Sequence, residues 1–222
     1  MKKKYLLKFK ILFKLYLYYF SLKYKFSHKN SYSQFGEDLI IDKFFGNFIG
    51  KYVDIGCYHP IKYNNTALLH KKGWNGCNID LNPISIDLFN VCRKKDLNIT
   101  ACLSDIKEEV TVYLDNYFSA LNSINPENSK NFQLKNTKKL NVKTQIFSEL
   151  VKENFDFLNI DCEGNDYKIL KTIDLKKYTP RLINIEVTKE NELDIYNYMN
   201  DNCYELLEIK SLSHIFKRND KK

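Results

Sequence analysis

The sequence predicts one α/β domain with a mostly parallel sheet, helices on both faces and an antiparallel hairpin that closes one edge. Three observations support this fold class. Apolar strand-like runs alternate with helix-like segments as βαβαβ over residues 51–103. Acidic residues recur where these runs end. Two further runs, 204–209 and 214–217, are close enough in sequence to pair as the closing hairpin.

The opening strand is predicted over Lys51–Ile55, and the rest of the chain is arranged around it. Its apolar run is broken only by Asp54, and Gly56 follows directly. A glycine at this point allows a sharp turn and lets a ligand approach the backbone. An acid at a strand end suits a cationic or hydroxyl-rich ligand group, since ligands of open α/β sheets bind outside the carboxyl ends of the strands. Taken alone, the motif is weak and better fits a strand-to-loop turn with a solvated carboxylate.

The other elements are predicted from periodicity and from capping residues. Helices are expected from Ser33 or Gly36 to Phe45, with Leu39, Ile40 and Phe44 inward, and at 64–72, 83–94, 147–154, 165–172 and 190–202. Strands are expected at 76–80, 99–103, 155–161 and 181–187, with a small extra strand at 110–113. The Asn82–Pro83 pair supplies an N-cap followed by proline at the first helical position. Residues 119–143 are rich in Asn, Lys and Ser and are expected to form a long loop over the site.

The positive charge of the chain belongs to one segment. Nine of the 35 basic residues are lysines within residues 1–30, which contain no acid, so the remaining chain holds 26 basic and 27 acidic side chains, a net charge of −1. The folded part is therefore neutral, which argues against a nucleic-acid-binding protein. We expect two parts: a basic, aromatic-rich N-terminal segment over 1–30 and the catalytic domain over 31–222.

The N-terminal segment contains an apolar, aromatic run at Ile11–Phe20. Lysines interrupt it, so it is too short for a bilayer span. Lys14 lies inside the run and no small-residue cleavage site follows, which argues against a signal peptide. Two interpretations stay open with equal weight: a peripheral anchor on the membrane surface, and a helix that packs on its own domain or on a second subunit.

The cysteines indicate a reducing compartment. They form no C-x-x-C pair and have no histidine at zinc-finger spacing, and most lie on or beside apolar runs, where cysteine behaves as a small hydrophobic residue. We therefore expect a cytoplasmic protein, peripheral at the inner face of the membrane if the N-terminal segment is an anchor. The six are Cys57, Cys77, Cys92, Cys102, Cys162 and Cys203.

Acids recur at the carboxyl ends of successive predicted strands, and a parallel sheet brings those ends to one edge. They are Asp54, Asp80, Asp105, Asp161 and Glu186. Neither G-x-G-x-x-G nor a P-loop is present, so a dinucleotide or nucleoside triphosphate is disfavoured. Acids suit a cofactor with ribose hydroxyls and an ammonium group but no pyrophosphate, such as S-adenosylmethionine. Asp80 would accept both ribose hydroxyls.

A set of motifs over residues 31–187 then resembles the FkbM-type methyltransferases. The motifs are Ser33–Asp38, Tyr52–Gly56 with His59–Pro60, Asn65–Thr66, Gly73–Gly76, Ile79–Pro83, Leu103–Asp105 and Phe157–Gly164. The resemblance implies a class I methyltransferase (Rossmann-like) sheet of seven strands, mostly parallel with an antiparallel closing hairpin, helices on both faces. It also implies S-adenosylmethionine as cofactor and O-methylation, often of sugars or polyketide-type hydroxyls.

The resemblance assigns the cofactor-binding residues by motif. Asp54 and Gly56 would line the methionine end of the cofactor, and Asp80 would hold the ribose. The remaining candidates are Ser104 and Asp105 beside the adenine, with Gln34, Glu37 and Asn65 as further contacts.

Catalysis is expected from acids around the fourth strand of the predicted sheet. Asp161, Glu163 and Glu186 would lie close enough to repel one another, so that one is protonated at neutral pH and another acts as base. Alternatively they share a divalent cation such as Mg²⁺, or Asp161 and Glu163 cap the next helix and stabilise the fold. His59 is a lesser candidate for the base.

We therefore expect an S-adenosylmethionine-dependent O-methyltransferase that acts on a hydroxyl, in a small-molecule or glycan acceptor such as a sugar of a surface glycan or its precursor. The alternative is a catalytically silent cofactor- or glycan-binding module. A dehydrogenase is disfavoured by the missing glycine fingerprint.

Overall fold

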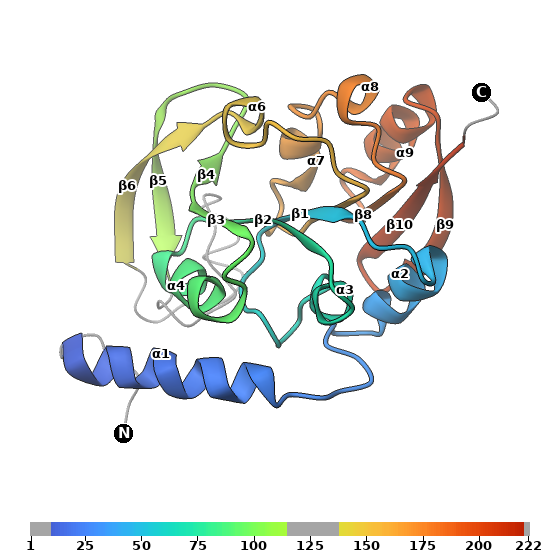
Figure 1. The fold of residues 1–222 in the computed structure, drawn as a ribbon. Helices are drawn as coiled ribbons and strands as arrows, with labels where there is room; N and C mark the ends of the chain where they lie inside the picture. Colours follow the sequence, from blue (N-terminus) through green and yellow to red (C-terminus); the bar gives the residue numbers. More distant parts are fainter. Residues whose placement is uncertain (1–9, 115–137, 220–222) are drawn as a thin grey trace.

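The computed structural model describes residues 10–114 and 138–219 and is built around a seven-stranded sheet (Figure 1). The strand order is β3-β2-β1-β7-β8-β10-β9. The bounds are Lys51–Ile55 for β1, Asn75–Asp80 for β2, Leu97–Thr100 for β3, Phe157–Ile160 for β7, Leu182–Glu186 for β8, Tyr204–Lys210 for β9 and Ser213–Arg218 for β10. The first five of these pair in parallel, whereas β10 runs antiparallel to both β8 and β9. The predicted mostly parallel sheet with its closing hairpin is confirmed.

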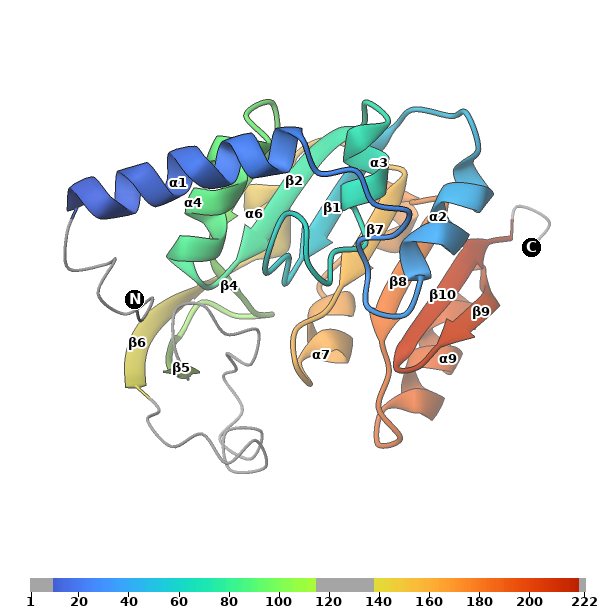
Figure 2. The same ribbon diagram turned by 90° about the horizontal axis from the view of Figure 1, so that it is seen from below.

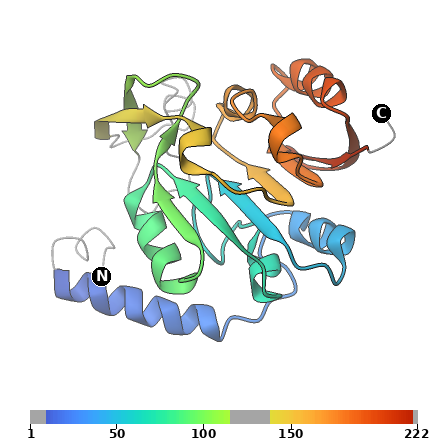
Figure 3. The same cartoon turned by 45° about the horizontal axis from the view of Figure 1, so that its top comes forward.

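Helices cover both faces of the sheet, as Figures 1 and 3 show. On one side lie α1 (Lys10–Lys25), α2 (Glu37–Phe45), α3 (Ala67–Lys71) and α4 (Pro83–Cys92). On the other side lie α6 (Phe147–Leu150), α7 (Asp166–Leu170), α8 (Leu175–Tyr178) and α9 (Glu192–Asp201). The predicted cap of α4 is present, since the Asn82 side chain accepts a hydrogen bond from Ile84 N at 3.0 Å, with Pro83 next in the chain.

The core forms two layers because successive strand side chains point to opposite faces. Val53 and Leu158 belong to the cluster that packs against α6, α7 and α9. Tyr52 and Phe157, one position away on the same strands, belong to the cluster that packs against α2 and α3. These two hydrophobic layers hold the sheet between the helices. The loops that follow the parallel strands lie at the carboxyl edge of the sheet.

A row of polar residues crosses the sheet on the α2 and α3 side. The register aligns Asn184, Asn159, Asp54, Asn78 and Asn98 on five neighbouring strands. The Asn184 amide donates to Asn159 at 2.8 Å, and the Asn159 amide donates to Asp54 Oδ1 at 2.8 Å. The Asn78 amide donates to Asn98 at 2.8 Å. Because buried polar groups are costly without partners, this row is stable only as a connected network.

The fully buried Arg93 guanidinium compensates the acids of this layer. Its Nη1 donates to Thr66 Oγ1 at 2.8 Å and to Tyr52 Oη at 3.0 Å. Thr66 in turn donates to Asp54 Oδ2 at 2.7 Å, and Tyr52 donates to Asp96. Thus one buried cation is linked through two hydroxyls to two buried carboxylates.

Two of the predicted elements near the third strand are wrong. The strand expected at 99–103 divides into β3 and β4 (Cys102–Leu103), and β4 leaves the main sheet to pair with β6 (Lys138–Gln145). Residues 138–143, expected as loop, pair antiparallel with β5 (Glu109–Leu114), which was predicted as a small strand at 110–113. The alternation of Leu140, Val142 and Thr144 with polar residues is the overlooked strand signal. The rest of the expected loop, 119–137, lies outside the described residues.

Helix α2 also differs from expectation. It begins at Glu37 after Gly36, and its buried apolar residues are Ile41 and Phe45. Leu39, expected inward, is 47% exposed. Four-residue spacing from Glu37 to Ile41 and Phe45 defines the inward face.

Helix α1 packs on the domain alongside α4 (Figures 1 and 2). Phe20 and Tyr24 are buried in a cluster with Ile61 and Leu88, so packing on its own domain is confirmed for one face of this helix. Within the part of the chain that the structure describes, no helix is both long and apolar enough to cross a bilayer. The six cysteines are free.

Candidate active site

A cleft opens at the carboxyl ends of β1, β2, β3 and β7, with an empty volume of about 920 Å³ including its open mouth. Its residues divide into an acidic part, with Asp80, Asp161 and Glu163, and an apolar part formed by side chains such as Leu103 and Ile169. This is the position at which open α/β sheets bind ligands. Of the five predicted strand-end acids, Asp80 and Asp161 line this cleft, whereas Asp54, Asp105 and Glu186 do not.

The floor of the cleft depends on a close backbone approach between β1 and β7. Gly56 has φ of +77°, and a Cβ placed on it would lie 1.7 Å from the Asp161 carbonyl oxygen. Gly56 N also donates to Ile79 O at 2.9 Å, while Asp161 N donates to Ile55 O at 3.0 Å. Only glycine fits here, which explains why the strand-end turn contains it.

Asp80 is held in place by the backbone. Its Oδ2 accepts a hydrogen bond from Tyr58 N at 2.7 Å, and its Oδ1 accepts one from Asn82 N at 2.7 Å. Burial raises the pKa of Asp80 to about 6, although the two backbone N–H groups act in the opposite direction. A carboxylate has about four acceptor positions, so two are available to a ligand in the cleft.

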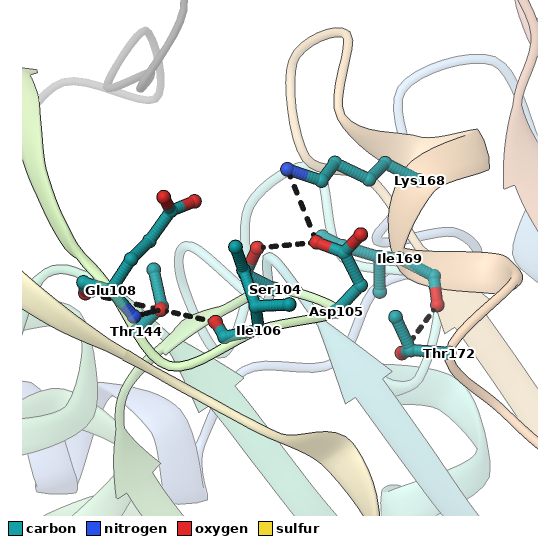
Figure 4. A network of polar contacts seen from close by, with 8 residues as sticks. All are labelled: Ser104, Asp105, Ile106, Glu108, Thr144, Lys168, Ile169 and Thr172. Carbon is teal, nitrogen blue, oxygen red and sulfur yellow. Dashed lines mark hydrogen bonds and ion pairs between the residues drawn. The ribbon is translucent and has the colours of Figure 1, made fainter.

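Strand β4 and helix α7 supply apolar residues of the cleft, Leu103 and Ile169. Polar contacts join the loop after β4 to α7 and β6 (Figure 4). Ser104 Oγ donates to Asp105 Oδ1 at 3.0 Å, and Lys168 Nζ of α7 lies 3.2 Å from the same oxygen. The Ser104 hydroxyl and then Lys168 lower the pKa of Asp105. Thr144 Oγ1 on β6 donates to Ile106 O at 2.6 Å, which attaches the second sheet to this loop. The pair of Asp105 and Lys168 is exposed, so it positions α7 with little energetic weight.

Carboxylates crowd the acidic part of the cleft. Burial, followed by Glu186 and other acids, raises the pKa of Asp161 to about 7. Burial and Asp161 raise the pKa of Glu163 to about 7, and burial and Glu163 raise that of Glu186 to about 7. Asp161 is an exposed residue at the open side of the cleft, so its carboxylate is only partly desolvated there. At neutral pH these groups share protons, which is the condition expected for a general acid–base site.

The turn after β7 is shaped by Asp166, the first residue of α7. Its two carboxylate oxygens accept hydrogen bonds from Cys162 N at 2.7 Å and from Gly164 N at 3.0 Å. One oxygen each of Asp161, Asp166 and Glu186 lie within 4.8 Å of one another. Neither Asp161 nor Glu163 is the N-cap of α7, since that position is Asn165, whose side chain makes no capping hydrogen bond. Asp166 instead holds the loop that carries both acids.

Three non-glycine residues of the cleft have backbone angles in the left-handed region. They are Tyr58, Tyr63 and Glu163, each with φ of +50°. Such residues cost about 1–3 kcal/mol each and tend to cluster at functional sites. Their occurrence in one cleft supports its assignment as the active site.

The structure brings some predicted residues into the cleft and places others elsewhere. The residues that line it are Gln34, Gly56, Asp80, Asp161 and Glu163. Sequence analysis missed Tyr58, Tyr63 and Asn165, which also line it. The left-handed backbone of Tyr58 and Tyr63 leaves no signal in residue type, because such positions usually attract Gly or Asn.

Asp54 and Asn65 do not line the cleft. Asp54 is fully buried in the polar row, and the Asn65 amide donates to Asn159 Oδ1 at 3.0 Å in the same layer. Asp54 Oδ2 also accepts from Asn64 at 3.1 Å. Their hydrogen bonds hold the opening strand and the loop after it, so their contribution to ligand binding is indirect.

Glu37 and His59 are likewise buried beside the cleft. Glu37 accepts a hydrogen bond from Phe35 N at 2.8 Å at the start of α2. His59 Nδ1 lies 3.1 Å from Ile61 N, from which it accepts, and the ring meets Phe20 edge-on at 4.9 Å between centroids. Glu186 ends β8, with a carboxylate oxygen within 4.8 Å of one of Asp161. Ser104 is buried and donates its hydroxyl to Asp105.

Comparison with known proteins agrees with this geometry. A family model described as the methyltransferase FkbM domain matches residues 54–206. The crystal structure of methyltransferase FkbM from Methylobacillus flagellatus KT superposes with a TM-score of 0.52 at 15% identity, over 76% of this chain and 43% of that one. The structure of TehB from Haemophilus influenzae gives a TM-score of 0.44 at 17% identity, over 90% of this chain and 66% of that one. No curated protein matches.

The fold is that of a methyltransferase with a mostly parallel seven-stranded sheet. The chain belongs to the FkbM methyltransferase family, since the family domain covers more than half of it. It spans less than half the length of the Methylobacillus structure, so that comparison supports the fold alone.

Proposed function

We propose that this chain transfers the methyl group of S-adenosylmethionine to a hydroxyl of a sugar, in a surface glycan or a precursor of one. The observation that carries the proposal is the arrangement of the cleft. The cleft combines a backbone-fixed carboxylate, Asp80, with apolar side chains and with carboxylates that titrate near neutral pH. Membership of the FkbM family supports methyl transfer as the reaction. The side chains of the cleft support the proposed methyl donor and acceptor.

The residues present fit S-adenosylmethionine. The two unused acceptor positions of Asp80 suit a pair of ribose hydroxyls. Leu103 and Ile169 provide an apolar surface for an adenine ring, close to the hydrogen-bonding groups of Ser104 and Asp105. Glu163, a further carboxylate of the cleft, suits the ammonium group at the methionine end of the cofactor. The cleft has no glycine-rich anion cradle, in agreement with a cofactor that lacks a pyrophosphate.

The bound cofactor supplies an activated methyl group on a sulfonium centre. The protein then has to hold the acceptor hydroxyl in line and remove its proton. Asp161 suits the proton acceptor, since a base with a pKa of about 7 is half deprotonated at neutral pH. Burial and the like charge of Glu186 keep that pKa high, and Asp166 holds the loop that carries Asp161 and Glu163.

The residues that line the cleft support a sugar as the acceptor. The rings of Tyr58 and Tyr63 stack at 6.5 Å between centroids with 12° between their planes. Gln34 and Asn165 add amide groups to the same lining. Aromatic surface combined with amides and carboxylates suits a polyhydroxylated ring, which presents both C–H faces and hydroxyl donors.

Turnover of methyl-labelled S-adenosylmethionine with a panel of sugar nucleotides and glycan precursors tests the proposal. We expect label in at least one acceptor hydroxyl, lost in Asp161→Asn and retained in Asp201→Asn, which alters an exposed acid on α9. Cofactor binding without turnover on any acceptor would favour the silent binding module. Activity lost to chelator and restored by Mg²⁺ would assign the Asp161, Asp166 and Glu186 cluster to a metal instead of a carboxylate base.

A further inference from the structure

Helix α1 is fixed to the domain by one face only. Phe20 and Tyr24 are buried, and the Tyr24 hydroxyl lies 2.6 Å from His70 Nδ1. Lys71 Nζ donates to the Tyr24 carbonyl at 2.5 Å and lies over the Tyr24 ring. These contacts anchor the C-terminal half of the helix, so its outward face has a fixed orientation.

The outward face of α1 is apolar. Ile11, Leu15, Tyr18 and Leu22 follow one another at spacings of four, three and four residues and therefore form a stripe along the helix. Their exposed fractions are 75%, 58%, 66% and 40%. Phe26, just after the helix, is 70% exposed. A helix that faces only water normally carries polar residues on this side.

Lysines border the stripe on both sides. At 100° per residue, Lys10, Lys14 and Lys25 lie along one border and Lys23 along the other, and α1 contains no acidic residue. Among the described residues, none of these four lysines forms an ion pair. An apolar stripe between basic borders is the pattern of a helix that lies in a membrane interface.

The basic surface continues from α1 onto the body of the domain. Lys25 also lines a second cleft, together with Lys71, Lys94 and Lys95 from α3 and the segment after α4. None of the described residues that line this cleft is acidic. The positive border of the stripe is thus extended by lysines that are fixed in the fold, where anionic groups would concentrate.

We propose that α1 docks this protein on an anionic membrane surface, with the stripe at the boundary between headgroups and acyl chains and the lysines on the headgroups. A second copy of the chain is the competing occupant of an apolar stripe. Pairing two copies would bring their lysine borders together without acids to compensate them, whereas anionic lipid compensates every lysine. Charge complementarity therefore favours the membrane.

Flotation of the full chain with vesicles tests the proposal. We expect binding to phosphatidylcholine vesicles that contain phosphatidylglycerol, and at least about tenfold weaker binding to phosphatidylcholine alone. Leu15→Glu with Tyr18→Glu should abolish flotation, because two charges enter the apolar stripe. Lys14→Glu should weaken it about fivefold or more. The matched control is Leu193→Glu, which changes a leucine that is 74% exposed on α9.

Circular dichroism and thermal unfolding of each variant separate loss of docking from loss of folding. If folded wild-type protein does not float on anionic vesicles, or if the Leu15→Glu, Tyr18→Glu variant floats as well as wild type, the proposal is wrong. A wild-type dimer in sedimentation that this double variant dissociates, with no flotation, would assign the stripe to a second copy.

Discussion

Gly56 and Asp161 meet backbone to backbone, such that a Cβ on Gly56 would lie 1.7 Å from the Asp161 carbonyl oxygen. This contact joins the ends of β1 and β7 and brings Asp161 to the centre of the cleft. The turn that contains Gly56 and the loop that carries Asp161, the candidate base, therefore hold each other in position.

Gly56→Ala should destabilise the protein beyond the cost of its left-handed backbone, which is about 1–3 kcal/mol for a non-glycine residue. The added methyl group also pushes β1 away from β7. Urea unfolding gives the free energy. Gly36→Ala is the matched control, since Gly36 lies in the left-handed region at φ +86° and ψ +21° and its Cβ would meet nothing closer than 3.9 Å. Equal losses in the two variants would show that the close contact has no energetic weight.

Arg93→Met should cost about 3–5 kcal/mol, because it removes the cation that compensates the buried Asp54 and Asp96. The methionine fills similar volume, so the loss reports the charge and its hydrogen bonds. Lys94→Met, the exposed neighbour, should change the free energy of unfolding by less than about 0.5 kcal/mol. A small effect of Arg93→Met would mean that the two acids are protonated in the folded state.

The acidic cleft should make stability depend on pH. The pKa of Asp161 rises to about 7 from 3.8, so the folded state binds more protons than the unfolded state between these values. This carboxyl therefore contributes stability that is present at low pH and lost as the pH rises through about 7. The melting temperature should fall between about pH 4 and about pH 7 and level off above that, and Asp161→Asn should reduce the fall. An unchanged pH profile in the variant would contradict the raised pKa.

The sequence predicted much of this arrangement because its signals are local. Alternation and apolar runs marked the strands, and the acids that follow them marked the edge of the sheet where the cleft lies. Asp80 and Asp161 could thus be placed from their position after a strand.

Other features depend on contacts between residues far apart in the chain. Arg93 bonds to Tyr52 and Thr66, which are 41 and 27 positions away, and nothing local distinguishes it from a surface arginine. Asp54 was expected at the ligand because it precedes Gly56, but its side chain points into the layer of the polar row. The departure of β4 from the main sheet follows from pairing with β6, a partner about 40 positions later, which no local pattern reveals.

Activity should follow the ionisation of Asp161. If this carboxylate removes the acceptor proton, kcat/KM should rise with pH and level off above about 7. Asp161→Asn should lower kcat by about 10²–10⁴ while leaving cofactor affinity nearly unchanged. Stopped assays across the pH range on the acceptor identified by the panel measure both. A variant with wild-type kcat and pH profile would remove Asp161 from the chemistry.

The most direct test of the central claim is titration calorimetry of S-adenosylmethionine on wild type, Asp80→Ala and the control Asp87→Ala on α4. We expect wild type and control to bind alike. Asp80→Ala should lose about 1.5–3 kcal/mol, or roughly 10- to 150-fold in affinity, with the loss of hydrogen bonds from the ribose to a charged group. Thermal unfolding of Asp80→Ala checks that the fold is kept. Equal affinity in a folded Asp80→Ala, or wild-type protein that binds NAD in place of S-adenosylmethionine, would contradict the account.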